Sequence, residues 1–162
     1  MKHKRFLFMS QGAIIAALYV VLTMLANFLG LANFAVQVRF SEALTVLPVF
    51  TGAAIPGLFI GCLISNLLSG CIIWDVIFGS LATLLGAVGT YLLRRFRLLS
   101  LLPPIIANIL IVPSVLVYAY DLEGTLPFFM LTVGMGEIIS CGGLGYFLRR
   151  VIEKNGKGIK WS

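Results

Sequence analysis

Residues 7–29 have the sequence LFMSQGAIIAALYVVLTMLANFL, a long apolar stretch without Asp, Glu, Lys or Arg. A transmembrane helix needs about 20 consecutive, mostly apolar residues to cross about 30 Å of hydrocarbon. The basic residues Lys2, Lys4 and Arg5 precede this stretch, and no small-residue cleavage site of the kind that ends a signal peptide follows them. The sequence therefore predicts that residues 7–29 form a membrane-spanning helix.

The rest of the chain has the same apolar character. Of 162 residues, 60% are hydrophobic and 11% charged, and the mean hydropathy is +1.05. Soluble domains carry about 25% charged residues, so this chain lacks the polar side chains that would cover a globular surface in water. We predict a single all-α membrane domain over residues 1–162, with six spans. The spans are expected at about 7–29, 41–52, 55–69, 77–93, 104–118 and 126–148.

The second of these segments is too short to cross a bilayer alone at about 1.5 Å per residue. Either preceding residues extend it, or the surrounding protein shelters it from lipid. A Ser-Glu pair at Ser41 and Glu42 suits the start of this helix.

The positions of the charges predict a topology, because Lys and Arg concentrate in cytoplasmic loops of membrane proteins. Except for Arg39, the basic residues precede the first span, separate the fourth from the fifth, or follow the sixth. Both termini are therefore expected in the cytoplasm, whereas most acids fall in the outer half. This separation across an apolar slab argues against nucleic-acid binding, despite the net charge of +6. The cytoplasmic bases are Lys2, Lys4, Arg5, Arg94, Arg95, Arg97, Arg149, Arg150, Lys154, Lys157 and Lys160.

Glu137 is the most informative polar residue, because it falls near the middle of the sixth predicted span. A charged group at that depth costs about 2.5–3.5 kcal/mol on the lenient insertion scale and suggests a functional site by default. The alternative is a structural carboxyl that is protonated or paired with Arg39.

Other polar residues near the outer ends of the spans have both structural and functional interpretations. Arg39 and Glu42 could form an ion pair, Asp75 could cap the fourth helix, and Trp74 could anchor it at the membrane surface. The asparagines within spans could form interhelical hydrogen bonds. Taken together, these groups suit a small, flat, polar ligand with several N–H donors, whose face an indole could cover. The candidate binding residues are Arg39, Glu42, Asn66, Trp74, Asp75, Asn108 and Glu137.

Small residues spaced four apart predict close helix packing. The stripes on the third and fourth spans favour packing within the chain. Ala13 and Ala17 lie in the cytoplasmic half of the first span, where either internal packing or docking of a partner protein could use them. Cys62, Cys71 and Cys141 lack the spacing of metal ligands and are expected to be small packing residues.

The sequence contains no catalytic constellation. Its only histidine is His3, and it has neither a phosphate-binding G-x-x-x-x-G-K-[ST] loop nor a His/Cys metal cluster. We therefore predict a transport protein without its own ATPase, metal or cofactor, driven by other subunits. Two alternatives remain: a stand-alone proton-coupled carrier that uses Glu137, and a membrane structural or assembly protein.

Three stretches resemble the QueT family of queuosine-precursor transporters. They are VQVRFSEALTVLP at 36–48, AIPGLFIGC at 54–62 and IWDVIFGSLATL at 73–84. The resemblance implies a six-helix substrate-binding (S) component of an energy-coupling factor (ECF) importer in a bacterial plasma membrane. Such a component works with a scaffold subunit and two ATPase subunits.

The resemblance also implies the ligand and the roles of the site residues. The ligand would be queuine or a related 7-deazaguanine bound at the outer face, with another vitamin-like molecule as the alternative. Glu42 or Glu137 would accept the paired N–H groups of the ring, and Arg39 or an asparagine amide would donate to its carbonyl. Trp74 could stack on the ring, and a further carboxylate such as Asp75 could meet an amine on the substituent. Ala13 and Ala17 match the small-residue motif that meets the scaffold.

Overall fold

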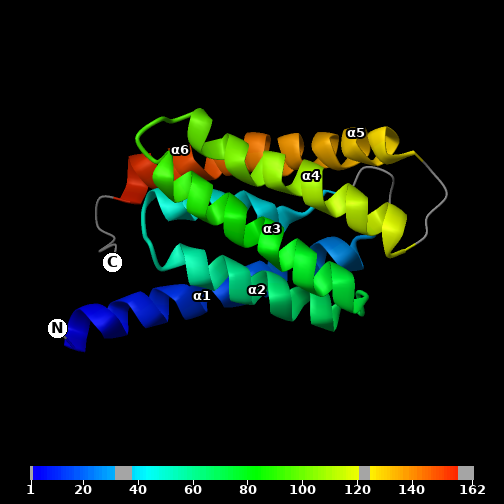
Figure 1. The fold of residues 1–162 in the computed structure, drawn as a ribbon. Helices are drawn as coiled ribbons and strands as arrows, with labels where there is room; N and C mark the ends of the chain where they lie inside the picture. The colour runs from blue at the N-terminus through cyan, green and yellow to red at the C-terminus, as the bar shows by residue number, and fades with distance from the viewer. Residues whose placement is uncertain (1, 32–37, 121–124, 157–162) are drawn as a thin grey trace.

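A computed structural model describes residues 2–31, 38–120 and 125–156, and within them all regular structure is helical (Figure 1). This confirms the predicted all-α class. In chain order the helices are α1 (Lys2–Phe28), η1 (Phe40–Val49), α2 (Ala54–Leu68), α3 (Ile73–Leu92), η2 (Leu99–Leu101), α4 (Leu102–Tyr118), α5 (Leu126–Glu137), η3 (Ile138–Gly145) and α6 (Tyr146–Asn155).

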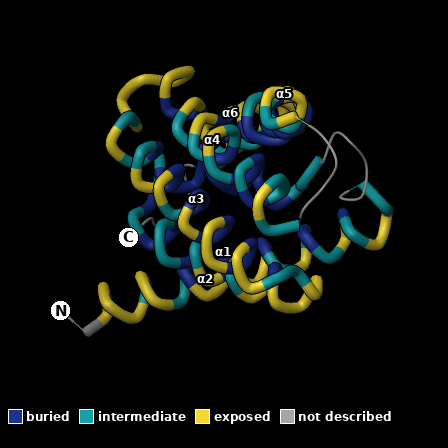
Figure 2. The backbone as a smooth tube through the Cα atoms, turned by 45° about the vertical axis from the view of Figure 1, so that its right-hand side comes forward, coloured by how far each residue is buried: buried dark blue, intermediate teal, exposed yellow. Residues whose placement is uncertain are grey.

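Four helical stretches in the described part of the chain are long and apolar enough to cross a membrane. They are His3–Phe28, Ile73–Leu92, Leu99–Tyr118 and Leu126–Asn155, while the helices Phe40–Val49 and Ala54–Leu68 are shorter. Six crossings and the orientation of the termini therefore stay predictions. The outward faces of the helices are exposed (Figure 2) and carry large apolar side chains such as Leu110 and Leu131, as expected where lipid is the solvent.

The short second segment is the 3₁₀-helix η1, which is enclosed by protein. Ser41 to Pro48 are all buried, and the helix packs against α1, α3 and η3. At a rise of about 2.0 Å per residue, its 10 residues cover only about 20 Å. Shelter by neighbouring helices, the second of the two options that the sequence left open, is therefore what the structure shows.

Two glycines with positive φ end the helices on the side opposite the termini. Gly30 has a φ of 73° and Gly70 a φ of 71°, which only glycine adopts without strain. After each, the next backbone N–H returns to a carbonyl five residues earlier, from Leu31 to Ala26 and from Cys71 to Asn66. This pattern is a Schellman cap, which satisfies the last carbonyls of α1 and α2.

The small-residue stripes pack against helices of the same chain. A Cβ placed on Gly57 would lie 2.7 Å from the Gly12 carbonyl oxygen, and one on Gly61 would lie 2.8 Å from the Tyr19 Cβ, so α2 packs tightly on α1. On α3, a Cβ at Gly86 would lie 2.6 Å from the Pro104 Cα of α4. Such approaches let dispersion forces hold membrane helices together.

The fourth predicted helix starts earlier than the sequence suggested. Residue 77 was the expected start, but α3 begins at Ile73 and its N-cap is Ile72. Asp75 is therefore a buried residue of the first turn, and the capping interpretation is wrong because no side chain caps this helix. No sequence signal marks the start of α3, because Ile72 and Ile73 are both apolar and neither is a typical N-cap residue.

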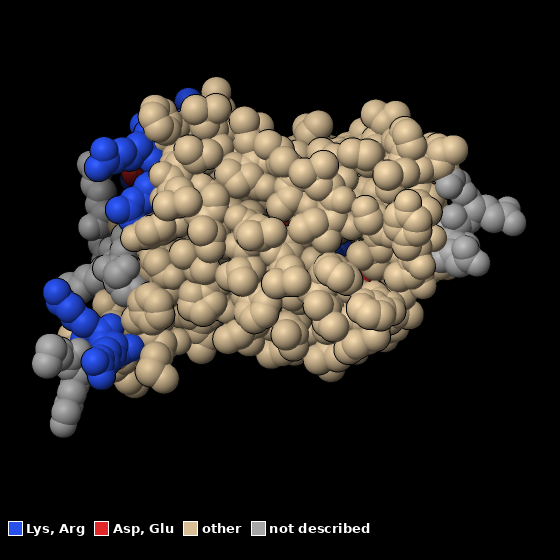
Figure 3. Space-filling view, in the orientation of Figure 1, with Lys and Arg blue, Asp and Glu red and all other residues tan. Residues whose placement is uncertain are grey.

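The end of the bundle that holds both termini is basic. Figure 3 shows Lys and Arg side chains gathered where α1 begins and α6 ends. There Arg149, which is 5% exposed, donates to the Arg97 carbonyl at 2.8 Å, to Ser100 Oγ at 2.7 Å and to Glu153 Oε1 at 2.8 Å. These bonds hold α6 against the segment before α4, and the chain stays helical to Asn155, beyond the expected end of the sixth span at residue 148.

Candidate ligand site

Glu42 is a buried carboxylate with one satisfied and one unsatisfied oxygen. It lies in the first turn of η1 and is 2% exposed. The Tyr19 hydroxyl of α1 donates to Glu42 Oε1, whereas Oε2 has no hydrogen-bond partner among the described residues. An unpartnered buried acceptor is costly, so this oxygen marks a place where a ligand donor would bind favourably.

Glu137, the last residue of α5, lies beside Glu42. It is 7% exposed, and the Cys141 thiol donates to its Oε2 at 3.1 Å. One atom from each of Glu42, Glu137 and Cys141 lies within 4.8 Å of the other two, so these residues could also ligate a metal ion. Two carboxylates so close together repel each other, and hydrogen-bond donors or a positive charge between them would relieve that repulsion.

The helix carrying Glu137 changes geometry at this point. After Glu137 the chain forms the π-helix η3, which includes Cys141 and the glycines at 142, 143 and 145. Single π-helical turns within α-helices often occur at functional sites. The Arg39 backbone N–H donates to Ser140 Oγ of η3 at 3.2 Å. Because Arg39 is the N-cap of η1, this bond joins the start of η1 to η3.

Arg39 and Asn108 complete the surroundings of the carboxylate pair. Asn108 of α4 is 4% exposed, and its amide lies near both Glu42 and Glu137. The charges of Asp75 and Glu42 both act on the Arg39 guanidinium. Arg39 therefore interacts electrostatically with Glu42 and with a second acidic group on α3.

This second group centres on Asp75, which is 6% exposed. The Tyr120 hydroxyl donates to Asp75 Oδ2 at 3.3 Å and accepts the Ile72 backbone N–H at 3.3 Å. Burial raises the pKa of Tyr120 to about 12, so the hydroxyl keeps its proton and acts as a donor. Asn66 contacts the same turn, donating to the Asp75 carbonyl at 3.4 Å, and so makes the interhelical bond that the sequence allowed.

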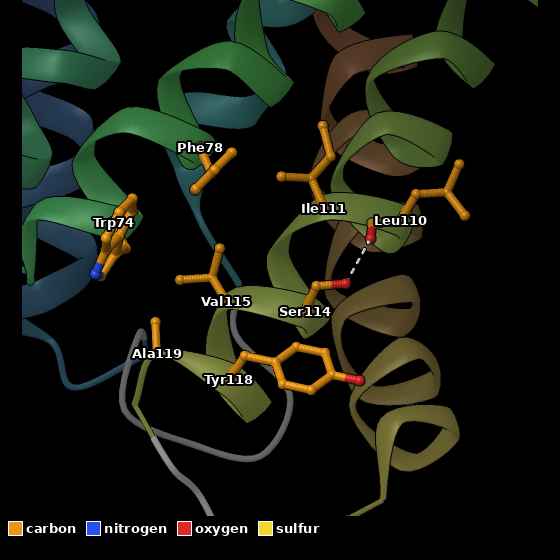
Figure 4. A pocket seen from close by; sticks show the side chains of 8 residues that line it. All are labelled: Trp74, Phe78, Leu110, Ile111, Ser114, Val115, Tyr118 and Ala119. Carbon is orange, nitrogen blue, oxygen red and sulfur yellow. Dashed lines mark hydrogen bonds between the residues drawn. The ribbon is translucent and has the colours of Figure 1, made fainter.

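The structure places Trp74 in a different environment. Its side chain is 54% exposed and stacks on Phe78, with ring centroids 6.0 Å apart. Both rings line an apolar groove of about 570 Å³ between α3 and the C-terminal half of α4, with Val115 and Tyr118 opposite (Figure 4). Trp74 is therefore not among the buried polar groups.

Ala13 and Ala17 lie on the exposed face of α1. With Gly12, Ala16 and residues of α2 such as Ile60, they line an apolar groove of about 550 Å³. α1 thus has two faces. The buried face packs on α2 and carries Tyr19, which bonds to Glu42, whereas the other face exposes Ala13 and Ala17.

Comparison with known families decides which protein class the chain represents. The model of the QueT transporter family matches residues 9–154. The chain belongs to the QueT transporter family. Comparisons with curated proteins and with solved structures found no significant match. Membership of QueT confirms the resemblance seen in the sequence, and it identifies a membrane transport protein rather than an enzyme.

Three residues of this candidate site were not predicted from the sequence. Tyr19 had no local signal, because a tyrosine within an apolar span is common and its partner is 23 positions away. Cys141 was expected only to fill space, whereas it donates to Glu137, and Tyr120 donates to Asp75. The spacing of Cys141 four residues after Glu137 was the one available clue.

Proposed function

We propose that this QueT chain is the S component of an ECF importer and captures queuine or a related 7-deazaguanine at its outer face. The observation that carries the proposal is the Glu42–Glu137 pair, which is buried in an apolar bundle and whose Glu42 Oε2 has no hydrogen-bond partner in the described part of the chain. A guanine-like ring edge offers adjacent N–H donors that one carboxylate accepts in parallel, the pairing that makes such bonds strong and directional.

The surrounding groups support the same ligand class. Asn108 can donate to a ring carbonyl or accept from a ring N–H, because an amide does both. Arg39 balances part of the negative charge, and Asp75 adds a third carboxylate near it. The excess of acids over bases favours a ligand that carries an amine on its substituent.

The proposed orientation follows the charges. The basic end, which holds the termini and residues 94–97, faces the cytoplasm, in keeping with the positive-inside rule. The opposite end, with Arg39 and Asp75, then faces outward. The chain would lie in a bacterial plasma membrane, and ATP hydrolysis by two partner subunits would drive release of the ligand inside.

Calorimetry on the detergent-purified chain tests the ligand assignment without any partner. Queuine, its aminomethyl and cyano precursors, and guanine would be titrated in turn. Saturable binding of at least one deazaguanine is expected, with guanine weaker where the substituent contributes. If a folded protein binds none of them, the substrate assignment is wrong and only the transporter family remains.

The groove at Ala13 and Ala17 is the proposed contact with the scaffold subunit. Its apolar lining and small residues allow close approach of a partner helix. Ala13→Leu with Ala17→Leu would fill the groove, so co-purification with the scaffold and ATPase subunits should fall at least tenfold while ligand affinity stays unchanged. Val88→Phe on the exposed face of α3 is the matched control. Unchanged co-purification of the alanine variant would contradict this docking site.

A stand-alone proton-coupled carrier predicts different behaviour. Vesicles containing only this chain would then accumulate ligand when a proton gradient is imposed. The proposal expects no uptake from the chain alone and ATP-dependent uptake once scaffold and ATPase subunits are added.

A further inference from the structure

Tyr19 is held unusually firmly for a side chain that reaches a binding site. It is 1% exposed and belongs to the apolar core with Ile15 and Leu58. Gly61 of α2 approaches so closely that a Cβ there would lie 2.8 Å from the Tyr19 Cβ. Tyr19 is therefore packed in the core where α1 meets α2, and its hydroxyl donates to Glu42 Oε1.

The backbone of Glu42 is fixed separately. Its carbonyl accepts from Thr45 Oγ1 at 2.6 Å and from Cys141 Sγ at 3.4 Å. These contacts locate the Cα, but they do not determine the direction of the carboxylate. Among the described residues, the direct hydrogen bond to that carboxylate comes from Tyr19 through Oε1, the Asn108 amide lies near it, and Oε2 has no hydrogen-bond partner.

We propose that Tyr19 is a positioning residue that orients the Glu42 carboxylate and thereby sets the preference for ligands with two adjacent N–H donors. This inference rests on the proposed function of the site. A carboxylate oxygen has room for two donors, so Oε1 can accept one ligand N–H beside the tyrosine hydroxyl while Oε2 accepts the other.

The preference follows from the cost of leaving an oriented acceptor unused. A site built to bind a donor rejects an analogue that lacks it, because a buried polar atom is then left unpaired. A carboxylate that is free to rotate can turn towards other donors, so it discriminates less. Loss of the Tyr19 hydroxyl should therefore reduce discrimination and not simply weaken all binding.

The test compares 7-deazaguanine with 7-deazahypoxanthine, which lacks the exocyclic amino group, on the full-length purified chain. In Tyr19→Phe the affinity for 7-deazaguanine should fall about tenfold, while that for 7-deazahypoxanthine changes less than about twofold, so their ratio collapses. An equal loss for both probes would show a merely structural role and overturn the proposal. Absence of 7-deazaguanine binding by the folded wild-type chain would instead refute the proposed function.

A double-mutant cycle isolates the route through Glu42. If Tyr19 acts through this carboxylate, adding Tyr19→Phe to Glu42→Gln causes no further change in the ratio; a further change overturns the proposal. Thr23→Val is the matched control, because Thr23 also joins α1 to η1, donating to Ser41 Oγ at 2.8 Å rather than to the Glu42 carboxylate. It should leave the ratio unchanged.

Glu42→Asp keeps the test decisive if Tyr19→Phe does not fold. The shorter side chain keeps the charge but withdraws the carboxylate from the Tyr19 hydroxyl. Discrimination between the two probes should therefore fall as it does in Tyr19→Phe. Retention of the full wild-type ratio by a folded Glu42→Asp protein would overturn the proposal.

Discussion

Two regions of the bundle each bury a charged side chain, but in different ways. At the basic end, Arg149 donates to two oxygens of the segment before α4 and to Glu153. In the interior of the bundle, Glu42 has one oxygen bonded to Tyr19 and another without a hydrogen-bond partner among the described residues. A charge that the chain satisfies itself is structural, whereas a charge left partly unsatisfied is available to a ligand.

The largest effect is expected when the carboxylate pair is neutralised. Glu42→Gln keeps the shape and an acceptor for Tyr19 but replaces a charged acceptor with an amide that repels ligand N–H groups. Affinity for the preferred deazaguanine should fall about a hundredfold, since hydrogen bonds to charged groups contribute about 1.5–3 kcal/mol. Calorimetry would measure the loss, and Glu137→Gln should cause a similar one.

The stability of the Glu42→Gln protein should not fall with its ligand affinity. Glu42→Gln removes a partly unsatisfied buried charge, so the unfolding temperature should stay the same or rise. A fall in stability with unchanged affinity would mean that Glu42 is structural, and the contrast with Arg149 would disappear.

The reverse pattern is expected at the basic end. Arg149→Met would remove the donor to Ser100 Oγ, one of two donors to the Arg97 carbonyl and the ion pair with Glu153, at a cost of about 2–3 kcal/mol. Thermal unfolding in detergent should therefore occur several degrees lower. Ligand affinity of the folded fraction should be unchanged. A loss of affinity would contradict the view that Arg149 is structural and Glu42 binds the ligand.

A smaller effect is expected at the Asp75 group. Tyr120→Phe removes a donor that lies 3.3 Å from Asp75 Oδ2, a bond contributing about 0.5–1.5 kcal/mol. Affinity for an amine-bearing deazaguanine should change by less than about tenfold. A loss of affinity as large as that of Glu42→Gln would show that Asp75, and not only the carboxylate pair, contributes strongly to ligand binding.

The smallest effect is expected at Trp74. Because the indole is 54% exposed in the α3–α4 groove, Trp74→Leu should change affinity less than about twofold in the same titration. A large loss would support stacking of the indole on the ligand, as the sequence suggested.

These contrasts show what the sequence could and could not predict. Hydropathy predicted the helical class, because an apolar chain of this length must satisfy its backbone within helices. It misplaced the start of α3, where Ile72 and Ile73 continue the apolar run, and it could not tell that η1 is a 3₁₀-helix. Glu42, Glu137 and Asn108 were recognisable because polar groups at membrane depth are rare.

The remaining parts of the site depend on contacts that are distant in sequence. Tyr19 meets Glu42 because η1 packs on α1. Cys141 reaches the Glu42 carbonyl because η3 packs on η1. Neither contact has a local sequence signal, since both follow from how the helices pack; only the spacing of Cys141 from Glu137 was visible in the sequence.

An experimental structure of the chain with its preferred deazaguanine tests the central claim most directly. The measurement is the distance from Glu42 Oε2 to the nearest ligand nitrogen. The account predicts a hydrogen-bond distance of about 2.7–3.2 Å, with the Tyr19 hydroxyl still on Oε1. A ligand bound in the Trp74 groove, with Glu42 Oε2 still unpartnered, would contradict it.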